Sequence, residues 1–352
     1  MRKLASIQLI KEIKPIEGAD RIEKIRINDW WCVSEKGNFK IGDMAVYFEI
    51  DSLLPSSNPV FNFLAKGCSE KTMTIDGREY KGYRLRTVKK LGILSQGLAL
   101  PLEILKITPV MIELGLFSIG DDLSDVLHIV KYEPLIPAHI AGKVKGSFPS
   151  FLKKTDEERV QNLGELIKEK AGTLMYVTEK LDGASATFYK KDGALGVCSR
   201  NLELLETEGN TLWEIAKKYE MKEELPENIA IQGEIVGEGI QKNPLKLKVH
   251  DFFVFNVFDI VKQQFYNFEE VEEFCNNFGL KMIPILDREY ILSDQVDTIL
   301  KLADGQSALS PLTNREGIVL RSLEEETVII DDYPARLSFK AISNNYLLAN
   351  KE

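Results

Sequence analysis

The sequence predicts an α+β protein in which a small N-terminal β-barrel precedes a larger domain built on mostly antiparallel sheets. Three observations predict this architecture. The 352 residues are more than one ordinary domain needs. Residues 1–122 carry many short strand patterns and few long helical periods, which is typical of a small barrel. Beyond residue 150, strand patterns are separated by helical ones.

Strand and turn signals follow one another in the first 122 residues. The stretch MAVYFEIDSLLP comes after the turn signal Gly42-Asp43, alternates, and stops at a proline. GYRLRTVKKLGILSQGLALPL is interpreted as two strands broken near Gly92. Residues 123–150 carry prolines and glycines among basic residues, so we expect a connector; an ordered surface crossing within one domain is the alternative.

Residues 151–352 make up the predicted second domain. A helix is expected over KTDEERVQNLGELIKEKAG, because Thr155 and Glu158 fit a capping box and a glycine follows the last apolar position. Strands are expected over TLMYVTEK, SATFYKK, ALGVCSR, IAIQGEIVG, FFVFNVFDI, GIVLRS and RLSFKAIS, and a further helix over EEVEEFCNNFG.

The composition is that of a globular protein, with 44% hydrophobic and 28% charged residues. No apolar run approaches the ~20 residues that span a bilayer, and Gln8, Lys11 and Glu12 interrupt any signal-peptide core. The expected location is therefore intracellular and soluble, in the cytoplasm by default. The net charge of −9 argues against a histone-like coating of nucleic acid but allows a local basic groove.

Cysteine and histidine give no metal or disulfide pattern. The four cysteines lie far apart without a C-x-x-C pair, and the three histidines show no ligand spacing. We interpret the cysteines as reduced thiols. Any catalytic chemistry must then rest on lysine, arginine, glutamate and aspartate.

A candidate site begins at Lys180, which ends an apolar strand and is followed by Asp182 and Gly183. Lys-x-Asp-Gly alone is a weak signal, because so short a pattern recurs by chance. A hairpin signal at residues 192–193 (Asp-Gly) places Lys180 and Arg200 at one cleft. Further motifs follow in order: Ser199-Arg200-Asn201, QGEIVGEGIQ with Glu234, FFVFNVFDI with Phe255, REGIVLR with Glu316 and LSFKAIS with Lys340.

This ordered set resembles the nucleotidyl motifs of the covalent nucleotidyltransferase superfamily, which contains polynucleotide ligases and messenger-RNA capping enzymes. Within it, the chain is similar to ATP-dependent RNA ligases of the nick-sealing type that carry an N-terminal OB domain. KTDEERVQNL, GEIVGEGIQ and SFKAISNNYLL look like that group, and the opening IKEIKPIEGADRIEKIRIND is similar to tRNA-binding OB-type modules. The resemblance implies an OB domain over residues 1–122, an adenylyltransferase domain over 151–352 and no C-terminal OB domain.

The resemblance implies an RNA-repair enzyme that joins 3′-hydroxyl and 5′-phosphate ends through a lysyl-AMP intermediate and an adenylated 5′ end. ATP and Mg²⁺ or Mn²⁺ are the implied cofactors. The implied partner is RNA, as a nicked duplex, acted on by a monomeric chain away from membranes. A GTP-dependent capping-type enzyme and a non-catalytic RNA-binding protein on the same fold are the alternatives.

The resemblance also implies residue roles. Lys180 is the nucleophile that attacks the α-phosphate of ATP, and Lys340 is the cation that steadies that phosphate. A free lysine has a pKa of ~10.4, so its attack needs cationic neighbours or a metal that favour the neutral amine. The other implied contacts are Glu179 and Phe255 with adenine, Glu234 with ribose, Arg200 with ribose or phosphates, Asp182 and Gly183 in the nucleotide pocket, and Glu316 with the metal.

Each of these residues has a structural alternative. Lys180, Glu234 and Glu316 are charged residues that could stand exposed at strand ends, Arg200 could form a surface salt bridge, and Phe255 could be a core residue.

The last motif departs from the pattern of related ligases, which often carry Lys-x-Lys. Here the sequence is Ser338-Phe339-Lys340, so either Ser338 replaces one lysine or the alignment shifts by a residue. The phosphate clamp is then one cation short, and Lys246 and Lys248 cannot be assumed to compensate.

Candidate nucleic-acid contacts lie in both domains. Arg84 and Arg86 should share one face of a strand, and Lys89 follows among further basic and aromatic residues, which suits a nucleic-acid groove. A charged edge strand that prevents aggregation is the alternative. Arg159 on the helix that leads into the site is a further candidate phosphate or RNA contact, with an ordinary helix-surface charge as its alternative.

Overall fold

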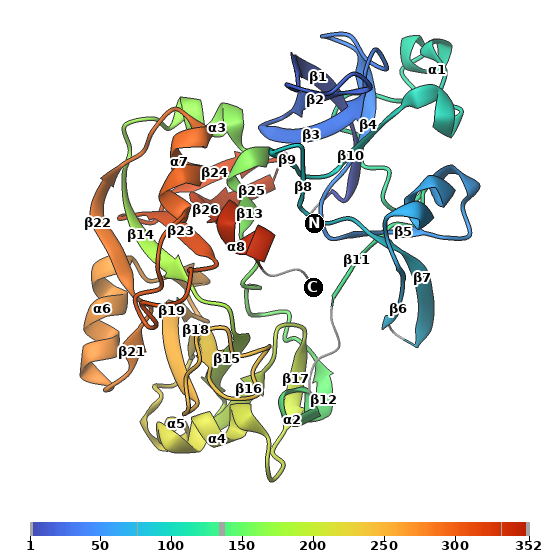
Figure 1. Cartoon of the computed structure of the whole chain (residues 1–352). Helices are drawn as coiled ribbons and strands as arrows, with labels where there is room; N and C mark the ends of the chain where they lie inside the picture. The colour runs from blue at the N-terminus through green and yellow to red at the C-terminus, as the bar shows by residue number, and fades with distance from the viewer. Residues whose placement is uncertain (1–2, 76, 134–137, 332, 350–352) are drawn as a thin grey trace. The chain divides into compact units, whose positions relative to one another are not determined.

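The computed structural model describes residues 3–75, 77–133, 138–331 and 333–349. The chain divides into two compact units (Figure 1). Unit 1 comprises Met1–Leu135 and Gln161–Gly164, and unit 2 comprises Ile136–Val160 and Glu165–Glu352. None of the helices in the described ranges is long and apolar enough to cross a membrane.

Unit 1 is built from two main sheets and a short hairpin. One sheet has the strand order β10-β4-β1-β2-β3, the other has the order β11-β5-β7-β6, and β8 pairs with β9. The strands are β1 (Ala5–Pro15), β2 (Ile22–Ile27), β3 (Trp30–Glu35), β4 (Met44–Phe48), β5 (Ser52–Pro55), β6 (Glu70–Ile75), β7 (Arg78–Arg84), β8 (Val88–Lys90), β9 (Ile93–Ser95), β10 (Leu98–Pro101) and β11 (Val130–Lys131). Helical segments are η1 (Pro59–Lys66), η2 (Leu102–Leu105) and α1 (Pro109–Glu113).

The first strand prediction for unit 1 is confirmed in outline, whereas the second stretch, expected as two strands, contains the end of β7 and the strands β8, β9 and β10. β4 and β5 cover the first predicted stretch, and β5 ends at Pro55. The break near Gly92 is the turn of the β8–β9 hairpin, where Gly92 has φ 80° and an L side chain would be strained.

Residues 123–150, expected as a connector, contribute elements to both units. Leu123 and Ile129 are buried in the core of unit 1, and β11 pairs with β5. In unit 2, α2 (Ala138–Ala141) is followed by β12 (Lys143–Ser147), which pairs with β17. On each side of residues 134–137, the described part of this stretch therefore contains a strand that pairs with another strand.

Unit 2 contains two larger sheets. The eight-stranded sheet runs β12-β17-β16-β15-β18-β19-β20 with β21 beside β19, and the five-stranded sheet runs β13-β26-β23-β14-β22. The strands are β13 (Glu158–Arg159), β14 (Leu174–Lys180), β15 (Ala184–Lys191), β16 (Ala194–Cys198), β17 (Leu202–Leu205), β18 (Ile229–Val236), β19 (Asp251–Asp259), β20 (Gln264–Phe265), β21 (Lys281–Met282), β22 (Ile285–Ile291), β23 (Gly317–Ser322), β24 (Thr327–Ile330), β25 (Tyr333–Arg336) and β26 (Ser338–Ile342). The helices are η3 (Val160–Asn162), α3 (Gly164–Glu169), α4 (Thr211–Lys218), α5 (Met221–Glu224), α6 (Phe268–Asn277), α7 (Val296–Ala303) and α8 (Asn344–Ala349).

The expectation of mostly antiparallel sheets is confirmed, with β13–β26 and β19–β21 as the parallel pairs among the described strands. The predicted hairpin is confirmed as well. Asp192 and Gly193 both have positive φ, and β15 and β16 pair on either side of them.

The helix predicted from Thr155 was wrong in its first half. The helix α3 begins only at Gly164, and residues 158–159 form β13, which pairs in parallel with β26. The proposed capping box does not form, because the Thr155 hydroxyl lies 3.1 Å from that of Ser185 and the Glu158 carboxylate accepts from the Arg159 amide. A distant strand therefore supplies the backbone partners that a local helix would have supplied.

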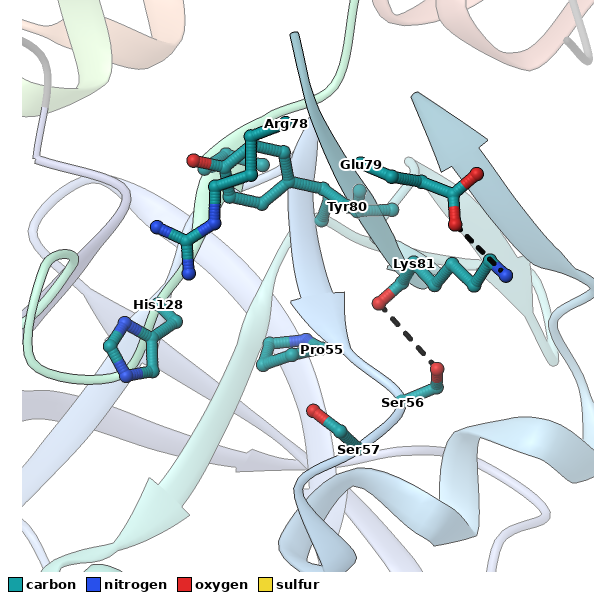
Figure 2. A pocket seen from close by; sticks show the side chains of 10 residues that line it. Pro55, Ser56, Ser57, Arg78, Glu79, Tyr80, Lys81 and His128 are labelled. Carbon is teal, nitrogen blue, oxygen red and sulfur yellow. Dashed lines mark hydrogen bonds and ion pairs between the residues drawn. The ribbon is translucent and has the colours of Figure 1, made fainter. Parts of the chain in front are cut away.

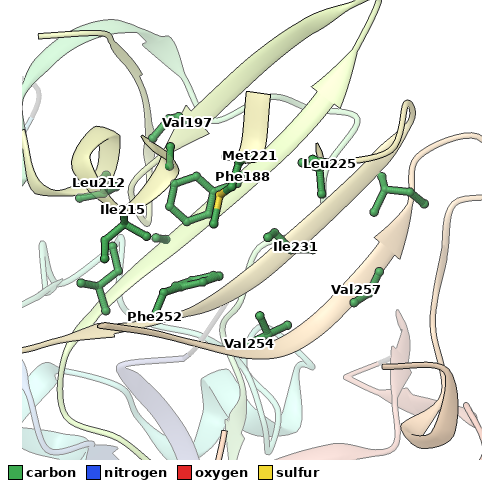
Figure 3. Close-up of a cluster of buried hydrophobic side chains, with 14 of the residues drawn as sticks. Phe188, Val197, Leu212, Ile215, Met221, Leu225, Ile231, Phe252, Val254 and Val257 are labelled. Atoms are coloured by element: carbon green, nitrogen blue, oxygen red, sulfur yellow. The ribbon is translucent and has the colours of Figure 1, made fainter. Parts of the chain in front are cut away.

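A hydrophobic core covers one face of the eight-stranded sheet, where α4, α5 and α6 pack (Figure 3). Phe252 and Val254 of β19 point into this core, whereas Phe253 and Phe255 belong to a cluster with Leu181. Opposite Gln232 and Gly233 the ladder skips Phe255, which is a β-bulge. Simple alternation already puts Phe255 on the face away from the main core, and the bulge there explains why Val257 returns to the core and why the aromatic residues alternate imperfectly.

Candidate active site

Lys180 is the last residue of β14, and its ammonium lies 2.7 Å from Oε2 of Glu316. The antiparallel register of β14 and β23 pairs Lys180 with Gly317, so Glu316 arrives directly beside the strand end. The two side chains are 27% and 17% exposed, which keeps the pair reachable by a ligand but partly desolvated. Lys180 is therefore not a free surface lysine.

Three carboxylates surround the Lys180 ammonium. Burial would lower the pKa of Lys180, but the negative charges of Glu316, Glu234 and Asp182 raise it above its ordinary value. Burial also raises the pKa of Glu234 to about 8. The positive charge of Lys180 lowers this pKa, and the negative charges of Glu316 and Asp182 raise it. The structure thus brings Glu316, Glu234 and Asp182, which come from different motifs, close to Lys180.

Gly183 allows the strand after Lys180 to lie against β18. A Cβ built on Gly183 would be 2.3 Å from the Ile235 carbonyl oxygen and 2.9 Å from Cγ of Glu234. The Gly183 carbonyl accepts a hydrogen bond of 3.2 Å from Gln241. Asp182 accepts a hydrogen bond from the hydroxyl of Tyr346 in α8, a partner that the sequence analysis missed.

Lys340 and Arg159 present their side chains on the same face of the five-stranded sheet as Lys180. Lys340 is paired with Val319, and Val319 is paired with Thr178, two residues before Lys180. Directly paired residues share a face of the sheet. The backbone of Lys340 is therefore two strand spacings, about 10 Å, from the backbone of Thr178 on β14. Arg159 pairs with Lys340 in the parallel ladder and is buried, so its interpretation as a helix-surface charge was wrong.

Arg321 is a buried cation beneath Phe255 that the sequence analysis did not single out. Its guanidinium lies 5.7 Å from the Phe255 ring centroid and donates to the Phe255 carbonyl at 3.2 Å. It also donates to Oγ of Ser338 at 3.1 Å and to Glu157 at 2.9 Å. Arg321 could have been identified from its place as the last residue of REGIVLR. Strand alternation puts it on the same sheet face as Val319, two residues earlier.

Arg200 and Glu179 lie in different surroundings. Arg200 forms an ion pair with Asp156, as its structural alternative supposed. Glu179 is fully buried on the other face of β14, and its Oε2 accepts from the Ala308 amide at 2.7 Å. Among the residues that the structure describes, none hydrogen-bonds the second oxygen of Glu179. Burial raises the pKa of Glu179 despite the neighbouring Ser307 hydroxyl, Ala308 amide and Arg315 charge.

The chemistry of this donor set fits a magnesium or manganese ion. Glu316, Glu234 and Asp182 are hard carboxylates that interact with Lys180, although among the described residues no three acidic, histidine or cysteine side chains are grouped closely enough to hold a metal by themselves. Mg²⁺ is commonly held by one or two carboxylates together with substrate phosphates and water. Glu316 is the most direct candidate, because its carboxylate already binds the ammonium of Lys180.

The nucleic-acid candidates of unit 1 do not share one strand. β7 ends at Arg84, which forms a 2.9 Å ion pair with Asp51, while Arg86 follows the strand and is exposed. Lys89 is exposed on β8. The prediction that Arg84 and Arg86 lie on one face of a strand was wrong, because the strand ends between them.

Comparisons with known proteins agree with this geometry. A family model of RNA ligases matches residues 173–342, and a model of an OB-fold domain matches residues 4–102. The chain is similar to a Naegleria gruberi RNA ligase solved with pyrophosphate, with 43% identity, a TM-score of 0.87 and coverage of 100% of this chain and 99% of that chain. A mutant of that ligase solved with ATP and manganese gives 42% identity, a TM-score of 0.85 and 98% coverage of both chains. The comparison with curated proteins gave no match.

Proposed function

The chain belongs to the RNA ligase family, and from this premise we propose that it joins a 3′-hydroxyl to a 5′-phosphate in RNA at the cost of one ATP. It is an ATP-dependent RNA ligase with an N-terminal OB domain. One observation carries the proposed chemistry. Lys180 stands at a strand end, 2.7 Å from Glu316, on the same sheet face as Lys340.

The first step forms a covalent lysyl-AMP. Nζ of Lys180, after losing a proton, attacks the α-phosphorus of ATP; a P–N bond forms, the bond to the β-phosphate oxygen breaks, and pyrophosphate leaves. Lys340, on the same sheet face as Lys180, would balance charge on the α-phosphate. A Mg²⁺ or Mn²⁺ ion, when bound, neutralises phosphate charge in this step, and Glu316 would hold it.

Two further steps complete the joining. An oxygen of the RNA 5′-phosphate attacks the AMP phosphorus, which breaks the P–N bond, frees the lysine and leaves an adenylated 5′ end. The 3′-hydroxyl oxygen then attacks the 5′-phosphorus, loses its proton and expels AMP as the phosphodiester forms. The protein's part in both steps is positioning and charge stabilisation.

Adenine recognition is proposed for Phe255 and Glu179. Strand alternation in β19 puts Phe255 on the face away from the main core, where its ring could stack on a base. The second carboxylate oxygen of Glu179 is an acceptor that the adenine 6-amino group could satisfy, whereas guanine presents a carbonyl oxygen there. Glu234 is proposed as the ribose contact and Arg200 as a ribose or phosphate contact.

For the substrate, we propose a nicked RNA duplex acted on by a monomer inside the cell, where RNA and ATP occur together. Arg159 would contact a phosphate or RNA close to Lys340. Arg84, Arg86 and Lys89 are proposed RNA contacts in unit 1, with Arg84 held in place by Asp51.

The test is incubation with α-labelled ATP, GTP or NAD and magnesium, followed by a denaturing gel. We expect a labelled protein band from ATP, lost in Lys180→Ala and kept in Lys191→Ala. Lys191 is a matched control, since it also ends a strand and pairs with an acid, Asp192, but lies at the far end of the hairpin. Label from GTP alone would instead indicate a capping-type enzyme.

Joining is tested next with a nicked RNA duplex that carries a labelled 5′-phosphate. Transfer of AMP to the RNA and conversion of the nick to a continuous strand are the expected products. Absence of protein label with both magnesium and manganese would contradict the proposal and favour a non-catalytic RNA-binding protein.

A further inference from the structure

A hollow of about 430 Å³ lies in unit 1, on the sheet that contains β5, β7 and β11 (Figure 2). Its walls include Arg78 and Tyr80 of β7, Pro55 and Ser57 at the end of β5, and His128 before β11. The hollow lies within unit 1 and contains none of the residues assigned to the active site.

The hollow is on the face of this sheet that does not form the core. Leu54 of β5 and Tyr83 of β7 point into the hydrophobic core of unit 1. Tyr80 lies three residues before Tyr83, so strand alternation puts Tyr80 and Arg78 on the opposite face. The fold thus holds an aromatic and a cationic side chain together at the surface.

Arg78 and Tyr80 form a cation–aromatic pair at the edge of the hollow. The Arg78 guanidinium carbon is 5.4 Å from the Tyr80 ring centroid. In Figure 2 the guanidinium extends toward His128 on the other side of the hollow. Planar cationic and aromatic groups of this kind stack on unpaired bases, and the guanidinium also binds phosphate.

A second cation–aromatic pair adjoins the hollow. The Arg84 guanidinium carbon is 4.7 Å from the ring centroid of Tyr132 and is fixed by the ion pair with Asp51. Arg84 is paired with Leu53, and Leu53 with Val130, and both of these residues line the hollow. The two cation–aromatic pairs therefore lie along one sheet face at opposite ends of β7.

The acid nearest to Arg78 in sequence is paired elsewhere. Glu79 forms a 3.0 Å ion pair with Lys81, and Figure 2 shows this pair apart from the Arg78 guanidinium and His128. Glu79 and Lys81 cancel each other's charge, so Arg78 gives the His128 side of the hollow its positive charge.

We propose that this hollow binds one unpaired nucleotide of the RNA strand, with the base against the Arg78–Tyr80 pair and the phosphate near Arg78 and His128. The inference rests on the proposed function, and it adds to the proposed substrate an unpaired nucleotide in a single-stranded stretch beside the nicked duplex. The hollow lies within the size range of small-ligand pockets, and a base locked inside a duplex does not reach such a pocket. Ser56 and Ser57 also line the hollow; the Ser56 hydroxyl donates to the Lys81 carbonyl at 3.5 Å and retains lone pairs that can accept from a ribose hydroxyl.

The test measures binding of the full-length protein, without ATP, to a fluorescent single-stranded RNA and to a blunt RNA duplex. We expect Arg78→Gln and Tyr80→Leu each to weaken single-strand binding about tenfold, within the range for one base stack. Tyr80→Phe should restore nearly wild-type affinity. Lys40→Gln is the control, since it removes one exposed charge of unit 1 from a residue that does not line the hollow, and it should change affinity less than twofold.

A second measurement does not depend on variant folding. RNA that carries one 4-thiouridine is cross-linked to the wild-type protein by light, and the labelled peptide is mapped; we expect it within β7 or around His128. A cross-link confined to other segments would overturn the proposal, as would equal losses for Arg78→Gln and Lys40→Gln. Equal weakening of duplex binding would point to general charge attraction and also overturn it. These assays need no lysyl-AMP, so failure of the ligase reaction would be seen separately in the labelling gel.

Discussion

Gly183→Ala is the substitution that most directly links the packing of unit 2 to the reactivity of Lys180. The added Cβ would lie 2.3 Å from the Ile235 carbonyl oxygen, and ordinary contact begins near 3.4 Å, so about 1 Å of movement is required. The contacted atom belongs to the backbone of β18, which cannot rotate away. The same Cβ would also meet Glu234, one of the carboxylates around Lys180.

The movement of the backbone around Gly183 should mainly lower the rate of lysyl-AMP formation. A misplacement of about 1 Å can cost on the order of a hundredfold in rate, which corresponds to about 2.7 kcal/mol of barrier. Overpacking should also lower stability by about 1–3 kcal/mol. The assay is single-turnover labelling at saturating ATP, with the thermal midpoint measured in parallel.

Gly146→Ala is the control, because a Cβ at Gly146 of β12 meets nothing within 4 Å and its backbone needs no positive φ. It should label at the wild-type rate. If Gly183→Ala labels within threefold of wild type, the close approach of the two strands does not position the nucleophile, and the reasoning fails.

Other predictions concern stability. Arg321→Met should lower the free energy of unfolding, measured in urea, by about 3 kcal/mol, because Glu157 loses its buried partner. Adding Glu157→Gln to this variant should restore at least half of the lost free energy. If it restores none, the ion pair is not the cause of the loss. Burial would raise the pKa of Asp251, but hydrogen bonds led by Lys281 lower it from 3.8 to about 2. A lowered folded-state pKa stabilises the fold above the unfolded-state value, so Asp251→Asn should cost about 2 kcal/mol at pH 7, and this difference from wild type should shrink as the pH falls from about 4 to 2. A difference that stays constant with pH would refute this assignment. Asn267→Ala should cost about 1 kcal/mol in thermal unfolding, since its side chain caps α6, and an unchanged midpoint would show that the cap is dispensable.

Much of unit 2 was predictable because local patterns and strand pairing agree there. The Asp-Gly turn specifies the β15–β16 hairpin, and Lys180 lies at the end of a strand whose apolar residues define it. The carboxylates Glu234 and Glu316 also lie at or near strand ends, so an antiparallel sheet brings them to one place without special geometry.

The wrong helix prediction has its cause in a pairing between distant segments. Residues 155–163 carry helix signals, yet Glu158 and Arg159 pair with residues about 180 positions later, and no local pattern announces that partner. The bulge at Phe255 likewise depends on how β18 and β19 match across the sheet. Tertiary pairing overrides weak local propensity in such places.

The departure in the last motif shows how a change in one strand can be matched by its neighbour. Where related ligases often carry a lysine, this chain has Ser338. Serine is shorter than lysine and has no positive charge to offer a phosphate. Its directly paired residue on β23 is Arg321, whose guanidinium donates to the Ser338 hydroxyl and to the Phe255 carbonyl. A cation is therefore present at this register after all, but it is 3% exposed and engaged by protein groups. If Phe255 stacks on adenine as proposed, the charge of Arg321 would act on the base through the Phe255 ring, and Lys340 would be the cation that acts on the phosphate.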